Sequence, residues 1–391
     1  MQQRFHELSI TGRAKNGSGK TFFCKIIREI QRFLSFSPLA VIDAAQLMAR
    51  PEFKNIDAPV KKFAFDTNYQ EQPTRFAIEL ILDDITYYYA FAVQGQEIVH
   101  ELLTKKYRRT EKLLERTSSS FKDITLRSEL KGFEDVKRMV KPEALCLPIA
   151  DLLNNPLASK IVSAINGIKV VSMTAGKLQP INPKKTFSED RLHKYLNIIR
   201  TADPTLRDIK VSFQEEEVEH QRNTSDDFEN RESIVKTTKV GVASRHAVYE
   251  NGKETTSAAI SFFKDESLGT VKLFTALPYL FDVLENGGAL IIDELENGLH
   301  LSLAKEIIRL FTNEKSNPHH AQLICTSHQP LLVDGEYRRD QVWITAKDDC
   351  GKSVLHRMSD LKTSRAKVNL TNRILENAFG CNPRLFFDNN T

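Results

Sequence analysis

The sequence has few cysteines, no long hydrophobic run and nearly balanced charges. Its five cysteines show no paired spacing, so no disulfide framework is indicated and a reducing, cytoplasmic setting is expected. No apolar stretch approaches the roughly 18 residues that a membrane-spanning helix needs, and the first residues do not resemble a signal peptide. A net charge of +4 over 391 residues does not require a nucleic-acid partner. No heptad pattern persists, which excludes a long coiled coil. From the lack of a long apolar run we expect no membrane partner. The small net charge leaves a nucleic-acid partner possible.

The most informative segment is an apolar stretch that ends in two acids. Residues 289–292 are Ala-Leu-Ile-Ile, and Asp293 and Glu294 follow them. Four consecutive apolar residues predict a strand that is buried on both faces of a sheet. Open α/β sheets bind ligands at the carboxyl ends of their strands. We therefore expect the two carboxylates to lie where the metal ion of a nucleotide would bind.

A phosphate-binding loop is predicted near the amino terminus. Residues 14–21 read Ala-Lys-Asn-Gly-Ser-Gly-Lys-Thr and match the pattern G-x-x-x-x-G-K-[ST], except that Ala14 replaces the first glycine. The glycines allow backbone N–H groups to point at phosphate oxygens, and Lys20 can reach the β- and γ-phosphates. An amphipathic helix is expected from residue 22 onward. A glycine-rich turn with a surface lysine is the alternative. The predicted phosphate-binding residues are Asn16, Gly17, Ser18, Gly19, Lys20 and Thr21.

Two further polar turns follow in the chain. Ser267 and Gly269 form a Ser-x-Gly turn before a helical pattern at residues 271–281, and such a turn offers a hydroxyl, N–H groups and the helix dipole to an anion. An N-capped helix without a ligand would show the same pattern. Residues 322–325 predict another buried strand, after which comes His328. A single histidine usually has a structural role. His328 is a candidate site residue only because it follows the P-loop, the Ser-x-Gly turn and the two acids in the chain.

The order P-loop, Ser-x-Gly-Thr, Asp-Glu, His resembles the ABC-type ATPase heads, in particular the soluble branch with RecF, SMC proteins, overcoming-lysogenization-defect proteins and bacterial abortive-infection ATPases. The motif sequences are most similar to those of the abortive-infection ATPases. The similarity is carried by Glu266-Ser267-Leu268-Gly269-Thr270, by Asp293-Glu294 with Leu299-His300, and by Thr326-Ser327-His328. The resemblance implies an α/β fold, namely a P-loop NTPase head with a mixed central sheet, an antiparallel β lobe and an inserted helical lobe.

The resemblance also implies ATP and Mg²⁺ as cofactors and a role for each residue of the site. Lys20 and Thr21 would hold phosphate and Mg²⁺, and Asp293 would order the ligands of the metal. Glu294 would polarise the attacking water, and His328 would contact the γ-phosphate. These roles describe an ATPase that converts ATP and water to ADP and phosphate.

A second copy of the chain is implied as a partner. In the related heads, the signature turn closes on the nucleotide of the other subunit, so Ser267 and Gly269 would complete the partner's site. Two composite sites in a C₂ homodimer satisfy this requirement. A higher homo-oligomer would also contain such sites.

Three segments are expected within one composite ATPase domain. Residues 1–104 would form the first lobe, with the P-loop and a β-subdomain, and residues 105–260 a mostly helical insertion. Residues 261–391 would carry the signature, the acids, His328 and a tail with a closing helix at 370–379. In the first lobe, residues 76–82 and 87–93 predict a β-hairpin.

Several segments allow more than one interpretation. The basic run at residues 105–116 fits a solvated helix face paired with Glu111 and Glu115, or a phosphate-binding surface. The polar residues 214–257 fit a mobile loop or a partner-binding arm. One strand, at residues 5–10, is expected before the P-loop. Related heads usually have two or three strands there, so the adenine side of the pocket is not predicted. The Q-loop glutamine is not assigned either, because Gln70, Gln72, Gln94 and Gln96 are equal candidates.

Three functions are compatible with these motifs. The preferred one is a nucleotide-gated sensor or scaffold in antiphage defence that controls a separate toxic effector. The second is a RecF-like clamp on DNA, which would show salt-dependent stimulation by DNA. The third is the energy subunit of a transporter. It is disfavoured, because Glu-Ser-Leu-Gly-Thr departs from the Leu-Ser-Gly-Gly-Gln wording typical of transporters.

Overall fold

The fold is seen in a computed structural model of the chain. It describes residues 9–12, 19–41, 60, 67–133, 136–173, 186–220, 233–333, 337–348 and 350–360. The predicted closing helix at residues 370–379 lies outside these ranges. None of the helices within them is long and apolar enough to cross a bilayer.

A six-stranded mixed sheet forms the centre of the molecule, as predicted, in the order β14-β13-β1-β12-β11-β7. Five strands run in the same direction and form four parallel pairs, and β14 is antiparallel at the edge. The strands are β1 (Ser9–Gly12), β7 (Lys169–Ser172), β11 (Ala289–Asp293), β12 (Gln322–Thr326), β13 (Val342–Lys347) and β14 (Ser353–Arg357). Strand β11 is buried at all five positions, which confirms the strand predicted before the two acids.

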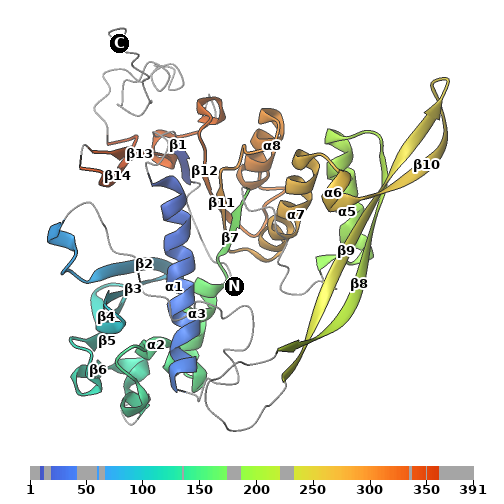
Figure 1. Cartoon of the computed structure of the whole chain (residues 1–391). Helices are drawn as coiled ribbons and strands as arrows, with labels where there is room; N and C mark the ends of the chain where they lie inside the picture. Colours follow the sequence, from blue (N-terminus) through green and yellow to red (C-terminus); the bar gives the residue numbers. More distant parts are fainter. Residues whose placement is uncertain are drawn as a thin grey trace, which may run out of the picture.

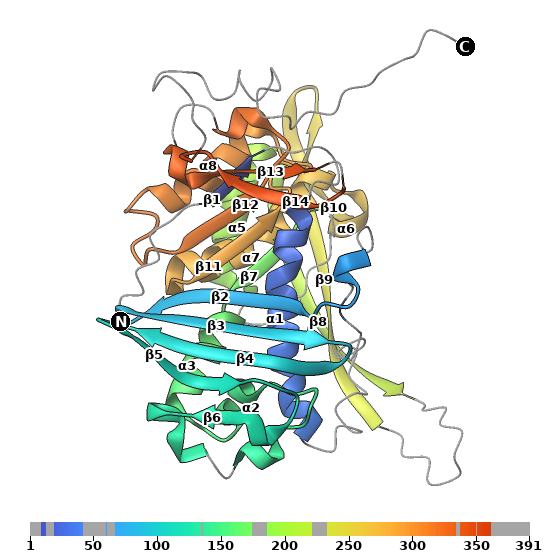
Figure 2. The same cartoon turned by 90° about the vertical axis from the view of Figure 1, so that its left-hand side faces the viewer.

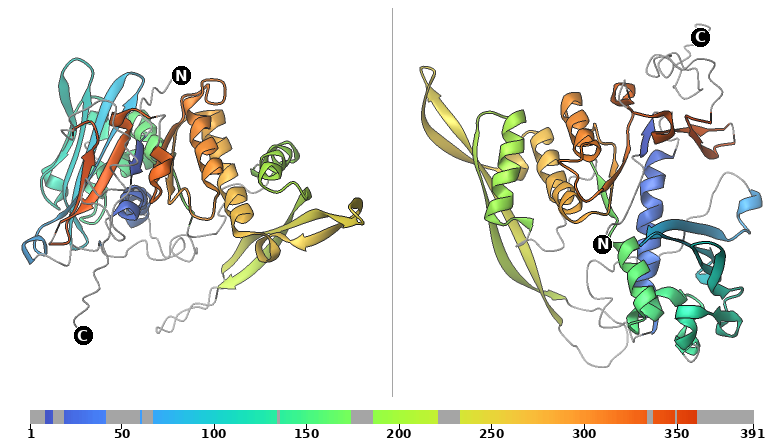
Figure 3. Two further views of the ribbon diagram at one scale, coloured as in Figure 1. Left: turned by 90° about the horizontal axis from the view of Figure 1, so that it is seen from above. Right: turned by 180° about the vertical axis from the view of Figure 1, so that it is seen from behind.

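Helices cover both faces of this sheet. Helix α1 packs against β11 and β7 on one face, and α7 and α8 lie on the other (Figure 3). Helix α1 begins at the end of the predicted P-loop, and α7 begins at the Ser-x-Gly turn, so both predicted helices are confirmed. The helices near the sheet and the arm are α1 (Lys20–Val41), α5 (Glu189–Ala202), α6 (Phe262–Asp265), α7 (Leu268–Asn286) and α8 (Leu301–Thr312).

Helix α1 links two hydrophobic cores. Its first turns lie at the central sheet, and its last turns reach the helices α2 (Cys146–Leu152) and α3 (Pro156–Asn166) (Figure 1). Ile30, Phe33 and Leu34 belong to the second core, which the antiparallel sheet forms with α2 and α3. The first core is formed by the central sheet with α5, α7 and α8. Helix α1 therefore packs against both parts of the molecule.

The predicted antiparallel lobe is a five-stranded sheet, which faces the viewer in Figure 2. The predicted hairpin is confirmed, because Asp83 and Asp84 form its turn with φ of 51° and 61°. Its strands are β2 (Thr74–Leu82), β3 (Ile85–Gln94), β4 (Glu97–Lys106), β5 (Thr110–Arg116) and β6 (Ile124–Leu126). Short 3₁₀ turns occur at Thr67–Tyr69, Phe121–Asp123, Ser128–Phe133, Val136–Met139, Pro330–Val333 and Arg339–Gln341.

The helices expected from residue 105 onward begin only at residue 146. Residues 105–126 continue the antiparallel sheet, and the boundary expected at residue 104 falls inside β4. Lys105 forms an ion pair with Glu111 at 3.4 Å, as expected, but across a hairpin instead of along a helix. Lys105 and Glu111 lie six residues apart, and opposite charges at this spacing can meet on facing strands of a hairpin as they do here.

Residues 206–261 form a three-stranded antiparallel arm that extends away from the central sheet (Figures 1 and 3). The strands are β8 (Leu206–His220), β9 (Ser233–Glu250) and β10 (Lys253–Ser261). The mobile loop expected from the polar composition of residues 214–257 is therefore wrong for the described part of that segment. Long antiparallel pairing satisfies the backbone hydrogen-bonding groups of this polar segment.

Candidate nucleotide-binding site

The site is built at the carboxyl ends of three neighbouring strands. Strand β12 lies between β1 and β11, and all three run parallel. The chain therefore leaves β1 toward the P-loop at the same edge where β11 ends in Asp293 and β12 ends in Thr326. This edge is where the sequence places the nucleotide.

The described part of the P-loop is its carboxyl end. Asn16, Gly17 and Ser18 lie outside the described residues. Gly19 has a φ of 104°, a conformation that favours glycine, and its carbonyl accepts the N–H groups of residues 22 and 23 at 3.0 and 3.2 Å. Helix α1 starts at Lys20, whose side chain is buried, and Thr21 is exposed beside it.

Helix α1 brings Lys20 to the end of β11. One turn further along α1, the thiol of Cys24 hydrogen-bonds to the carboxylate of Asp293, and burial together with that carboxylate raises the pKa of Cys24. Residues four apart share one face of a helix. Lys20 and Cys24 therefore face the same end of β11, so the predicted phosphate-binding lysine and the predicted metal ligand lie in one region.

Thr326 joins the two acidic residues to β12. Its hydroxyl donates to Oδ1 of Asp293 at 2.6 Å, and it accepts the backbone N–H of Glu294 at 2.9 Å. Asp293 and Thr326 are both buried. Asp293 takes hydrogen bonds from the hydroxyl of Thr326 and the thiol of Cys24, which are both neutral donors. A buried carboxylate with neutral donors fits Mg²⁺, which prefers oxygen ligands, and the hydroxyl of Thr21 is the second candidate ligand.

Glu294 and His328 form the open part of the site. Nε2 of His328 lies 3.6 Å from Oε1 of Glu294, and the two side chains are 34% and 25% exposed. Glu294 has a φ of 54°, an uncommon conformation for a residue with a side chain. The backbone N–H of His328 donates to the side chain of Glu296. The two predicted catalytic residues are therefore neighbours, and solvent can reach both.

A buried lysine that the sequence motifs do not include is connected to Glu294. The side chain of Asn297 donates to Oε2 of Glu294 at 2.8 Å and accepts from Nζ of Lys272 on α7. Burial lowers the pKa of Lys272, and the carboxylate of Glu294 opposes that shift. A signal was available, because Lys272 is the one charged residue among the apolar residues 268–281. It links the signature helix to the acid.

Ser267 and Gly269 lie at the other end of this connection. Ser267 is the N-cap of α7 and accepts the N–H of Thr270 at 3.2 Å. A Cβ at Gly269 would lie 2.6 Å from the carbonyl oxygen of Gly298, so only glycine fits there. The signature turn is therefore held against the loop that follows Glu294, and Ser267 is exposed on the surface.

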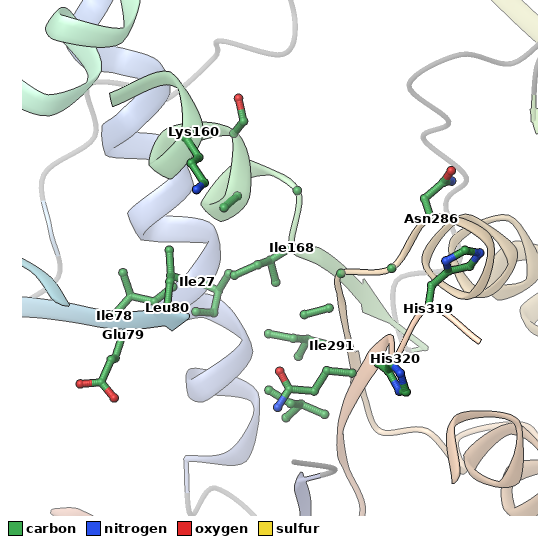
Figure 4. Close-up of a pocket in the computed structure, with 18 of the residues that line it drawn as sticks. Ile27, Ile78, Glu79, Leu80, Lys160, Ile168, Asn286, Ile291, His319 and His320 are labelled. Atoms are coloured by element: carbon green, nitrogen blue, oxygen red, sulfur yellow. The ribbon is translucent and has the colours of Figure 1, made fainter. Parts of the chain in front are cut away.

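A cavity of about 840 Å³ lies away from these residues (Figure 4). It is lined by Gly288, Ala289 and Gln322, where β11 and β12 begin, and by Ile27 and Lys160. Asp293 and Thr326 are at the opposite ends of the same strands. This cavity is therefore separate from the predicted nucleotide site.

The parallel sheet with its acid-tipped strand, the helix that starts at Lys20 and the capped Ser-x-Gly turn form the α/β architecture that the sequence predicts. Residues 175–334 match the family model described as "AAA domain, putative AbiEii toxin, Type IV TA system". The matched segment contains the signature, both acids and His328. It confirms the predicted relationship to the abortive-infection ATPases.

Two solved structures are similar over much of the chain. A structure of an SMC head bound to the C-winged helix domain of ScpA is 12% identical, with 91% of each chain covered and a TM-score of 0.34. The SMC head domain from Thermotoga maritima is 10% identical, with 70% of this chain and 74% of that chain covered and a TM-score of 0.25. Among curated proteins, none matches the sequence.

Proposed function

We propose that this chain binds and hydrolyses ATP with Mg²⁺, and that its nucleotide state makes it a sensor or scaffold in bacterial antiphage defence. The observation that carries the proposal is the meeting of three chain segments at one sheet edge. Helix α1 brings Cys24, one turn after Lys20, to Asp293, and Glu294 lies 3.6 Å from His328. The family match supports the same conclusion.

Each residue has a task that suits phosphoryl transfer, which asks mainly for positioning and for neutralisation of charge. Lys20 holds the β- and γ-phosphates, and Thr21 and Asp293 hold Mg²⁺, which neutralises charge on the phosphate oxygens. Glu294 accepts a hydrogen bond from the attacking water and so raises its nucleophilicity. His328 lies beside Glu294 and contacts the γ-phosphate.

The signature turn serves a second copy of the chain in this proposal. Ser267 is exposed and caps a long helix, so its hydroxyl and the N–H groups of the turn can meet the γ-phosphate bound by a partner. ATP would then hold a homodimer together through two composite sites, and hydrolysis would release it. The Lys272–Asn297–Glu294 connection relates the two sites within each subunit.

A change of the proposed water-polarising acid tests the hydrolysis. Glu294→Gln keeps the shape of the side chain but weakens its attraction for the protons of water. We expect ATP binding to persist, turnover to fall by about 100-fold or more, and the protein to accumulate as an ATP-bound dimer in light scattering. Glu306→Gln, at an exposed acid on α8, is the matched control. Wild-type turnover in Glu294→Gln would remove the proposed role.

The role in defence is tested by what the protein holds in its native cell. We propose that the ATP-bound state retains or releases a separate toxic effector. Purification of the native complex with ATP and with ADP should yield a protein partner in only one of the two states. Salt-dependent stimulation of turnover by DNA, without a protein partner, would point instead to a clamp on DNA. Co-purification of a membrane protein would point to a transporter.

A further inference from the structure

Three side chains with metal-binding atoms meet beside the signature turn. Asp203 follows α5, His246 lies on β9, and Glu266 immediately precedes Ser267. One nitrogen or oxygen from each lies within 4.8 Å of the other two. Nε2 of His246 is 2.6 Å from Oε1 of Glu266, and Nδ1 is 3.8 Å from Oδ2 of Asp203. The three residues come from separate elements, so the tertiary fold assembles the cluster.

The contacts around His246 orient both of its ring nitrogens. The hydroxyl of Thr205 donates to Oδ1 of Asp203 at 2.7 Å and lies 2.9 Å from Nδ1 of His246. In the tautomer whose Nδ1–H donates to Thr205, Nε2 presents its lone pair beside the Glu266 carboxylate. A metal ion bound there would be held by both groups.

We propose that Asp203, His246 and Glu266 bind a divalent transition-metal ion, with Zn²⁺ the best match. Imidazole and carboxylate together suit zinc, whereas Mg²⁺ and Ca²⁺ prefer oxygen ligands alone. Zinc binds such atoms at about 2.0–2.2 Å. Small side-chain rotations suffice, because the three atoms are already within 4.8 Å of one another. The Glu266 side chain is only 3% exposed, which strengthens its attraction for a cation.

A neighbouring cavity gives the ion a route and a fourth ligand. The cavity is about 610 Å³ and is lined by Asp203, Ser267, Gly269 and His300, among others. Water from it can occupy the coordination position that the three side chains leave open. The site is separate from the nucleotide site, where Asp293 is the proposed ligand.

The bound ion would tie three parts of the molecule together. It would join the end of α5 and the arm strand β9 to Glu266, the residue before the signature serine. Metal binding would therefore fix the signature turn relative to the arm.

The experiment measures zinc binding by the full-length protein after metal removal, in buffer with Mg²⁺, by calorimetry. We expect one saturable site in the wild type. His246→Ala and Glu266→Gln should each weaken it by about 100-fold or more. His193→Ala, at an exposed histidine on α5, should leave it unchanged. Zinc should also raise the melting temperature of the wild type but not that of His246→Ala.

Cobalt gives a readout that does not depend on a variant's folding. Co²⁺ added to the metal-depleted wild type should produce the visible absorption of a four-coordinate nitrogen and oxygen site, and Zn²⁺ should displace it. Absence of saturable zinc binding in the wild type would overturn the proposal. So would equal zinc affinity in the wild type and in folded His246→Ala.

Discussion

Glu294 is held in an uncommon backbone conformation by contacts on both of its sides. A residue with a side chain pays roughly 1 kcal/mol or more for φ near +54°. The hydroxyl of Thr326 accepts its N–H, and Asn297 donates to its carboxylate. Strain of this kind persists where the surroundings fix the residue. The direction of the carboxylate is therefore set before any nucleotide binds.

Lys272 should affect turnover through this arrangement. Lys272→Met removes the donor to Asn297 and leaves the apolar packing of α7 in place. We expect turnover to fall by about tenfold, equivalent to about 1.4 kcal/mol of activation free energy. The KM for ATP should be nearly unchanged, because Lys272 acts through Asn297 instead of binding the nucleotide.

Two comparisons separate this positioning role from a structural one. Lys272→Arg keeps a donor and should recover part of the lost turnover. Lys210→Met, at an exposed lysine on β8, should behave as the wild type. Unchanged turnover in a folded Lys272→Met protein would show that the connection to Glu294 has no part in hydrolysis.

The alkylation rates of the cysteines test whether α1 packs on β11. Burial raises the pKa of Cys24 and raises the pKa of Cys325 to about 12, whereas Cys350 is exposed. Only the thiolate reacts with alkylating reagents, so iodoacetamide at about pH 8 should label Cys350 long before Cys24 or Cys325. Peptide mapping by mass spectrometry checks this, with Cys350→Ser as the control. Rapid labelling of Cys24 in the native protein would contradict the contact with Asp293.

At the scale of elements, a buried acid on β4 attaches helix α2 to the antiparallel sheet. Leu145, the N-cap of α2, offers no side-chain hydrogen bond. Glu101 accepts the N–H groups of Cys146 and Leu147 at 2.7 and 3.0 Å, together with the hydroxyl of Tyr89 at 2.9 Å. A carboxylate at a helix N-terminus also interacts favourably with the helix dipole. The cap that the helix lacks locally is thus supplied by a strand.

Removal of this acid should destabilise the protein. Glu101→Ala leaves three buried donors without an acceptor, so we expect a loss of about 3 kcal/mol in the free energy of unfolding, at roughly 1 kcal/mol for each. Glu97→Ala, at an exposed position of the same strand, should cost little. The midpoints of urea unfolding provide the comparison. Equal midpoints for the two variants would show that α2 does not depend on Glu101.

The elements with strong local patterns are those that the sequence predicts. The all-apolar run before Asp293, the helical spacing after Lys20 and the Asp83-Asp84 turn each follow from short-range rules, and the structure confirms them. The same rules bring Glu294 and His328 to neighbouring strand ends. A site built from strand ends is predictable once the strands are.

The remaining elements depend on partners that are far away in the sequence. Strands β5 and β6 form because β5 pairs with β4 and β6 pairs with β5, whereas the charge spacing of residues 105–116 alone fits a helix equally well. The arm strands β8 and β9 place Ile209, Val211 and Val242 against the first core, but this alternation is short within a long polar segment. Strand β7 is short and is defined by its pairing with β11. The connection of Lys272 to Glu294 could not be predicted, because it depends on Asn297, which lies 25 residues further along the chain.

For the whole molecule, the composite site makes a prediction about mixtures. Ser267→Arg should block the signature and Lys20→Ala should remove phosphate binding, so each variant alone should be inactive. A mixed dimer keeps one intact site, made of Lys20 from one subunit and Ser267 from the other. An equal mixture should regain roughly a quarter of wild-type turnover if dimers form at random.

The control for this experiment is each variant alone at the total concentration of the mixture. Recovery only in the mixture identifies a site shared between subunits. A mixture that stays inactive, while gel filtration shows that mixed dimers form, would contradict the shared site.

The position of β1 also has a consequence for synthesis of the protein. Both of its neighbours in the sheet, β12 and β13, come from the last part of the described chain. During translation, β1 therefore has no sheet partner until β12 and β13 have been synthesised. The proposed nucleotide site, which also includes His328 after β12, would then be completed only after these later strands are available.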